Sequence, residues 1–178
     1  SRLMDMVSDQ IYRNEKNSHV MIGILSHIVE FRNSESAQHV LQVQTVTEML
    51  LRKLTEKTDV YGLTEEKIRL ITTASALHDI GKISIPEHIL KKTEGLTPEE
   101  YAIMKTHVEN SIKMIRYLPN MDYVIPAVIA HHERYDGKGY PRGLKGTGIP
   151  LMGRILTIAD CFDAMTARRP YKQERSID

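Results

Sequence analysis

The sequence lacks several features that would each indicate a particular class of protein. It has one cysteine, Cys161, so an internal disulfide cannot form and the reducing cytoplasm is the expected compartment. No stretch approaches the roughly 18 uninterrupted apolar residues of a transmembrane helix. The 24 basic residues nearly balance the 23 acidic ones. The composition therefore gives no support for binding to a nucleic-acid polymer or to a membrane surface.

Alternating patterns typical of β-strands are missing as well, and no internal repeat occurs. Apolar residues recur instead at three- and four-residue spacing, which predicts amphipathic helices. A chain of 178 residues is long enough for one domain with a sizeable core. The expected fold is therefore all-α, with longer helices over residues 3–32, 34–57, 64–77, 97–117, 121–132 and 151–166.

Residues 1–32 are expected to form a lead-in helix and residues 33–178 the main domain. The first helix has an apolar stripe that polar residues from Asn14 to His19 interrupt. Such a stripe fits a helix that forms a dimer with a second copy of itself or connects to an upstream input domain. It fits equally well an ordinary first helix that packs on its own domain, and the pattern does not separate the two.

Glycine is concentrated between Tyr135 and Pro150. A stretch so rich in glycine and proline cannot form a helix or a central strand. Long irregular loops inside compact helical domains are usually functional. We therefore expect this loop to border a binding site.

Histidines and aspartates fall in or beside apolar stretches, about one position for each predicted helix. Each such buried polar group would cost ~1–3 kcal/mol without a partner, whereas convergence on metal ions satisfies all of them. The set is too large for one tetrahedral zinc ion and suits two or three iron or manganese ions, with Asp79 as the expected bridge. The candidates are His39, His78, Asp79, His107, His131, His132 and Asp160.

Several of these positions also have a plainer interpretation. The pair His78-Asp79 by itself is equally compatible with a capped helix end whose side chains are solvated. His39 could be a buried histidine with one satisfied hydrogen bond. Cys161 follows Asp160 on a helix and therefore faces elsewhere, so we expect a small buried residue there and not a ligand.

Two motifs resemble those of the HD-GYP family, the branch of the HD superfamily that contains bacterial cyclic di-GMP phosphodiesterases. They are His78-Asp79-x-Gly81-Lys82 and His131-His132-Glu133-x-x-Asp136-Gly137-x-Gly139-Tyr140-Pro141. The resemblance covers about residues 30–173. It implies a helical bundle with a non-haem metal site that hydrolyses cyclic di-GMP to pGpG, to GMP or to both.

The resemblance also implies individual roles. Asp79 and Lys82 are the expected catalytic residues, and Glu35 one turn before His39 is the expected further ligand of a third metal. A solvated charge at the helix start is the alternative for Glu35, and a surface lysine for Lys82. The implied metal ligands are Glu35, His39, His78, Asp79, His107, His131, His132 and Asp160, and the implied substrate contacts are Lys82, Tyr140, Arg169 and Lys172.

Two departures from the family pattern are visible. Val108 and Ser111 stand where the family usually has proline and glycine, so we expect altered packing and unchanged chemistry. The chain stops at Asp178, so we also expect C-terminal helices of the family to be missing.

The resemblance further implies a diguanylate cyclase partner for the glycine-rich loop. Two rival functions stay open, another HD-type nucleotide phosphohydrolase and a regulatory module that binds cyclic di-GMP without turnover.

Overall fold

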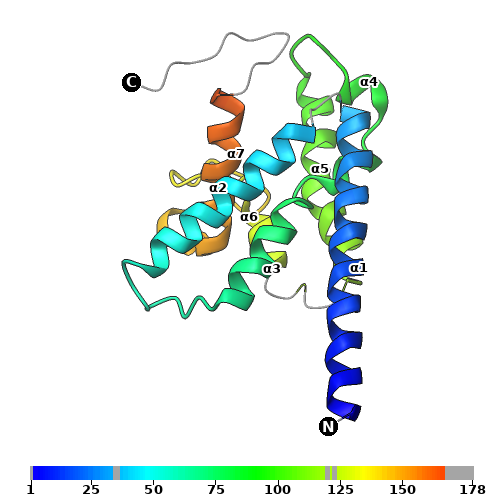
Figure 1. Cartoon of the computed structure of the whole chain (residues 1–178). Helices are drawn as coiled ribbons and strands as arrows, with labels where there is room; N and C mark the ends of the chain where they lie inside the picture. Colours follow the sequence, from blue (N-terminus) through cyan, green and yellow to red (C-terminus); the bar gives the residue numbers. More distant parts are fainter. Residues whose placement is uncertain (1, 34–36, 119–120, 122–123, 167–178) are drawn as a thin grey trace.

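The computed structural model describes residues 2–33, 37–118, 121 and 124–166, and this part of the chain contains helices and no strand. The predicted all-α fold is confirmed (Figure 1). The helices are α1 (Arg2–Asn33), α2 (Ala37–Thr55), α3 (Glu65–Ser75), α4 (Glu87–Leu90), α5 (Pro98–Ile115), α6 (Ile125–Ala130) and α7 (Leu151–Thr166), with short 3-10 turns η1 (Ile80–Ser84) and η3 (Gly146–Gly148).

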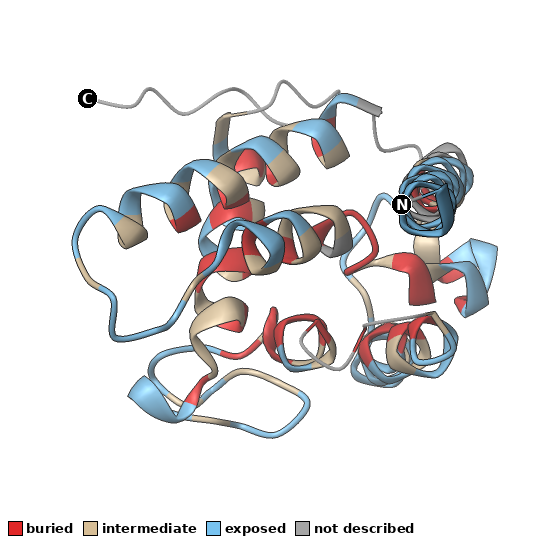
Figure 2. Ribbon diagram, turned by 60° about the horizontal axis from the view of Figure 1, so that its bottom comes forward, coloured by how far each residue is buried: buried red, intermediate tan, exposed pale blue. Residues whose placement is uncertain are grey.

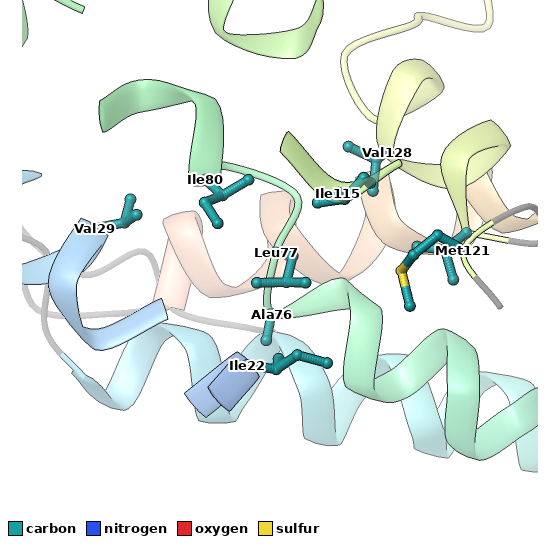
Figure 3. Packing of buried hydrophobic residues seen from close by; sticks show 9 residues of the cluster. Ile22, Val29, Ala76, Leu77, Ile80, Ile115, Met121 and Val128 are labelled. Atoms are coloured by element: carbon teal, nitrogen blue, oxygen red, sulfur yellow. The ribbon is translucent and has the colours of Figure 1, made fainter. Parts of the chain in front are cut away.

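The helices pack around a shared interior. α2 contacts both α3 and α7, α6 lies between α7 and α5, and α5 covers η1. Figure 2 shows buried residues on the sides of these elements that face one another. The largest apolar cluster joins α1, the segment after α3, and the ends of α5 and α6 (Figure 3). Its buried members are Ile22, Val29, Ala76, Leu77, Ile80, Ile115, Met121, Val124 and Val128.

Two glycines allow close approach between these elements. A Cβ at Gly81 would lie 2.0 Å from the backbone oxygen of His107, so only glycine lets η1 lie against α5. A Cβ at Gly153 would lie 2.6 Å from the Cβ of Ala130, which brings α7 directly onto α6. Both contacts lie beside candidate metal ligands, so the close packing also sets the positions of those ligands.

The first helix has two unlike halves. Its N-terminal half extends beyond the rest of the domain (Figure 1), and Leu3, Val7 and Ile11 are exposed there. Its C-terminal half packs on the domain through Ile22 and Val29. The interruption in the apolar stripe therefore lies between a half that extends away from the domain and a half that contributes to its core.

Two polar contacts tie the packed half of α1 to the segment that follows α3. The Ser26 hydroxyl donates to the backbone oxygen of Ala76 at 2.9 Å, and the Arg32 guanidinium donates to that of Ile85 at 2.8 Å. These carbonyls lie on either side of His78-Asp79.

None of the helices in the described ranges combines the length and the apolar character needed to cross a membrane.

Some predicted helix boundaries were wrong. α3 ends at Ser75, not at residue 77, and α6 begins at Ile125, not at residue 121. The chain after α3 follows tighter bonds, such as His78 N–H to Ser75 O and Ile80 N–H to Leu77 O. Apolar periodicity continues through these turns because they are buried, so the pattern alone extends the helix too far.

Candidate metal centre

His78 and Asp79 lie in the buried turn between α3 and η1. The Ser111 hydroxyl on α5 donates to the backbone oxygen of His78 at 3.0 Å and accepts from the Gly81 N–H at 2.8 Å. One side chain thus holds both ends of the turn that presents the two candidate ligands. Ser111 was predicted to alter packing only, and the structure shows that it makes these two hydrogen bonds.

Three buried histidines share one arrangement. In each, the ring Nδ1 lies against the backbone oxygen three residues earlier, and because a carbonyl only accepts, Nδ1 carries the proton. In the neutral form of each ring, Nε2 is therefore the nitrogen that can bind a cation, and each Nε2 is buried with no hydrogen-bond partner within the described structure. The Nδ1–O distances are 2.6 Å for His78 to Ser75, 2.7 Å for His107 to Met104 and 2.5 Å for His131 to Val128.

The free Nε2 atoms surround the Asp79 carboxylate. Oδ1 lies 3.2 Å from His107 Nε2 and 3.7 Å from His131 Nε2, while Oδ2 lies 3.3 Å from His78 Nε2. Neighbouring ligands of one ion bound at about 2.1 Å lie about 3.0–3.4 Å apart. Where these imidazole nitrogens are unprotonated, the carboxylate repels them unless a cation lies between them, so the donor set fits a metal.

The described residues form two groups with metal-binding geometry. The first group is Asp79, His107, His131 and His132, and the second group is His39, His78 and Asp160; within each group the donor atoms lie within 4.8 Å of one another. Asp160 Oδ1 is 3.7 Å from His39 Nε2 and 4.0 Å from His78 Nε2. Asp79 directs Oδ1 toward His107 and His131 and Oδ2 toward His78, so its carboxylate lies between the histidines of the two groups.

Burial and charge determine the protonation of these side chains. Burial lowers the pKa of His132 to about 2 and also lowers the pKa of His131, so both imidazoles are neutral. Burial would lower the pKa of His78 too, but the Asp79 carboxylate outweighs it and raises that pKa to about 9, so without a metal ion Nε2 of His78 carries a second proton that a bound cation would replace. Although burial raises the pKa of Asp79, Lys82 and His78 hold it well below its usual range. Lys82 Nζ lies 2.7 Å from Asp79 Oδ2.

The glycine-rich loop is fastened to the first group by Glu133. This buried carboxylate accepts from the backbone N–H of Arg142 at 2.7 Å and of Leu144 at 2.8 Å. Sequence reasoning treated Glu133 only as part of the motif, and its position directly after two candidate ligands was the signal for this role. At Gly139, a Cβ would lie 2.3 Å from the backbone nitrogen of Arg134, so the loop folds tightly under the site.

Tyr140 closes one side of the first group. Its N–H donates to the backbone oxygen of His132 at 3.1 Å, and its ring stacks on the imidazole of His132 with centroids 4.7 Å apart. Burial raises the pKa of the Tyr140 hydroxyl, which therefore stays protonated. The side chain of Tyr140 is partly buried at the border of the first group.

The structure thus brings together seven of the eight predicted metal ligands, with Lys82 and Tyr140 at their border. Glu35, Arg169 and Lys172 lie outside the described residues. Cys161 was expected to be buried, and this was wrong, since it is exposed on the outer face of α7. Asp163, a buried carboxylate on α7 whose Oδ2 lies 2.5 Å from His39 Nδ1, was not predicted from the sequence.

Comparison with known proteins identifies the class to which this site belongs. The sequence profile of the HD domain family matches residues 19–178. The chain therefore belongs to the HD domain family, whose phosphohydrolases use divalent metals. Its histidine-rich motif and glycine-rich loop assign it to the HD-GYP branch, and the resemblance noted from the sequence is confirmed.

Several curated relatives match most of the chain. It is 37% identical over 166 residues to the cyclic di-GMP phosphodiesterase response regulator RpfG of Xanthomonas campestris, covering 92% of this chain and 42% of that protein. It is 39% identical over 160 residues to a cyclic di-GMP phosphodiesterase of Thermotoga maritima, covering 89% of this chain and 42% of that protein. A 3'3'-cGAMP-specific phosphodiesterase of Vibrio cholerae is 40% identical to it over 159 residues, and the match covers 88% of this chain and 29% of that protein. The chain spans less than half the length of these relatives.

Proposed function

We propose that this domain hydrolyses the phosphodiester bonds of cyclic di-GMP in a metal-dependent reaction, giving pGpG, GMP or both. The observation that carries the proposal is the set of three buried Nε2 atoms, without hydrogen-bond partners among the described residues, arranged around Asp79. Buried ring nitrogens without partners are costly unless a cation, a proton or a metal ion, fills the space between them and the carboxylate. The names of the relatives support cyclic di-GMP as the substrate.

The ligands that we propose for the metal are the two groups, with Asp79 between them. When bound, divalent ions would supply Lewis acidity and an activated water for attack on phosphorus. A mixed imidazole and carboxylate set suits iron best and manganese next. A third ion is part of the proposal through Glu35, which stands four residues before His39 in the sequence and lies outside the described residues.

The side chains around the two groups would bind and orient the substrate. Lys82 Nζ, beside Asp79, is positioned to hold a phosphoryl oxygen and to stabilise the charge that develops on it. Tyr140 offers its ring for stacking on guanine and its hydroxyl as a donor. Arg169 and Lys172 are the proposed contacts of the distal phosphate, since a guanidinium matches the geometry of phosphate oxygens.

We also retain two proposals for protein partners. A dimer through α1 is supported by the exposed apolar side chains of its N-terminal half, among them Leu3, Val7 and Ile11. A diguanylate cyclase partner would contact the outer side of the glycine-rich loop, where Tyr135 and Lys138 are exposed. Deletion of residues 1–20 with no change in oligomeric state, measured by light scattering, would contradict the dimer.

The test is an assay with metal-free protein reloaded under anaerobic conditions with Fe²⁺ or Mn²⁺. Cyclic di-GMP, 3'3'-cGAMP, cyclic di-AMP, cyclic GMP and deoxynucleoside triphosphates are compared at one concentration, and products are separated by chromatography. We expect cyclic di-GMP to be hydrolysed fastest and activity to return only with metal. The exposed Cys161→Ser variant, on the outer face of α7, is the matched control and should keep wild-type turnover.

Each rival function predicts a different result. Faster turnover of 3'3'-cGAMP would assign the domain to the specificity of the Vibrio relative. Faster hydrolysis of deoxynucleoside triphosphates or cyclic GMP would indicate another HD-type phosphohydrolase. Metal-loaded protein that binds cyclic di-GMP without turning it over would indicate a regulatory module. Any of these three outcomes contradicts the proposed activity.

A further inference from the structure

Asp163 is the buried carboxylate of α7 that neither group includes. Its side chain is 1% exposed, and its Oδ2 lies 2.5 Å from Nδ1 of His39, which is 124 residues earlier in the chain. The other oxygen, Oδ1, is also buried and has no hydrogen-bond partner among the described residues. A carboxylate buried with so few donors destabilises a fold unless its charge is used.

The contact fixes the orientation of the His39 ring. A carboxylate accepts, so the proton of a neutral imidazole lies on Nδ1, and Nε2 is left as the free acceptor. That Nε2 lies 3.7 Å from Asp160 Oδ1, inside the second group. Asp160 and Asp163 are three residues apart on α7 and therefore share one face of the helix. One helix face thus provides a candidate ligand and the group that orients its neighbour.

We propose that Asp163 is a positioning residue that holds His39 with Nε2 directed at the second group, and that it thereby sets the metal affinity of this group. The inference rests on the proposed function, because it assumes that the second group binds metal. Histidine ligands in metal sites usually donate their other N–H to a carboxylate or a carbonyl. In His78, His107 and His131 a backbone carbonyl takes that role, and in His39 Asp163 takes it.

The test measures metal binding and not turnover. Metal-free wild type, Asp163→Ala and Asp163→Asn are dialysed against graded Mn²⁺, and bound metal is counted for each protein. The same series is repeated in a His107→Ala background, in which the first group is disabled and the bound metal reports on the second group alone. We expect Asp163→Ala to weaken binding at the second group about 10- to 100-fold. Asp163→Asn should lose less, since an amide oxygen still accepts from Nδ1–H.

Controls assign each effect to its group. Asp160→Asn removes a carboxylate of the second group and should abolish its binding, whereas exposed Cys161→Ser should change nothing. Binding at the first group, read in a His39→Ala background, should stay within about twofold in the Asp163 variants. Circular dichroism identifies variants that fold, and if Asp163→Ala does not fold, Asp163→Asn decides the question.

Two negative results are distinguishable. If wild type binds metal in both groups and both Asp163 variants bind it equally well, Asp163 only stabilises the fold and the inference is wrong while the proposed function stands. A lower thermal stability of the metal-free variants with unchanged metal affinity would lead to the same conclusion. If wild type itself binds no Mn²⁺ or Fe²⁺, the proposed metal-dependent function fails together with the inference.

Discussion

The two groups of candidate ligands are adjacent in space but are built in different ways. In the first group, His107 on α5 and His131 directly after α6 are each oriented by a carbonyl of that helix, three residues earlier. In the second group, His39 is oriented by Asp163 from a helix 124 residues away in the chain. The rings of His107 and His131, like that of His78 in the second group, are therefore oriented by local backbone geometry, while the ring of His39 needs α2 and α7 to be packed in the right register.

Because of this difference, we expect the two groups to respond unequally to changes in helix packing. A disturbance at the packing between α2 and α7 moves His39 relative to Asp160 and leaves the histidines of the first group with their own carbonyls. Asp79 links the two groups because it directs one oxygen to each. Three kinds of variant should therefore give different results: a change at Asp79, the loss of a ligand from one group, and the loss of a contact that supports a group.

The largest effect should come from Asp79→Asn, which removes the carboxylate that lies between the two groups and should therefore affect both of them. An amide cannot bridge two cations as a carboxylate does, so metal should be lost from both groups. We expect turnover of cyclic di-GMP to fall by at least about 10³-fold, because residues that act as a unit fail together. Elemental analysis beside the turnover assay provides the measurement. Retention of two ions would refute the bridging position.

Next in size is a pair of variants that removes one ligand from each group. His107→Ala and His39→Ala should each lower the number of bound ions by one and reduce turnover by about 10²- to 10³-fold. His39→Ala should leave the affinity of the first group unchanged, since His39 belongs to the second group and the histidines His107 and His131 of the first are oriented by backbone carbonyls. Titration with Mn²⁺, monitored by electron paramagnetic resonance, measures the number of bound ions and their affinity in both variants. Equal loss of all metal in the two variants would mean that the groups are one unit.

A smaller effect is expected from Ser111→Ala, which tests how the turn between α3 and η1 is held. The variant leaves the Gly81 N–H and the His78 carbonyl unsatisfied in a buried place. The free energy of unfolding should fall by about 1–3 kcal/mol. Urea denaturation measures it, with Ser84→Ala as the matched control on the same turn, since that exposed hydroxyl also donates to a carbonyl, that of Gly81. A loss no larger than the control's would argue against the role of Ser111.

The smallest effect should come from Tyr140, which supports the first group from outside. Tyr140→Leu removes the stack on His132 and should cost about 0.5–1.5 kcal/mol of stability. Tyr140→Phe keeps the ring and should preserve stability while raising KM if the hydroxyl contacts substrate. Thermal unfolding and steady-state kinetics separate the two contributions. Equal stability of the leucine and phenylalanine variants would exclude a contribution from the stack.

Much of the first group was readable in the sequence. His131, His132, Glu133 and the glycine-rich loop lie close together in the chain, and apolar neighbours indicated that His107 is buried. The chain-local bonds of these histidines follow from helix geometry once they are on helices. Asp163 was not found, because an aspartate three residues after another candidate looks like an ordinary solvated position of a helix. Cys161 was misjudged for the related reason that apolar neighbours did not reveal which face of α7 is covered.

The sequence by itself determined that the chain is all-α and supplied the family motifs, since periodicity and short motifs record local geometry. It also carried the residue types that a metal needs. Only the tertiary structure decided that Ser111 holds the turn of His78 and Asp79, and that Asp163 faces His39. Such contacts depend on how distant helices pack, and the physical reason they escape the pattern is that a partner 30 or 124 residues away leaves no local signal.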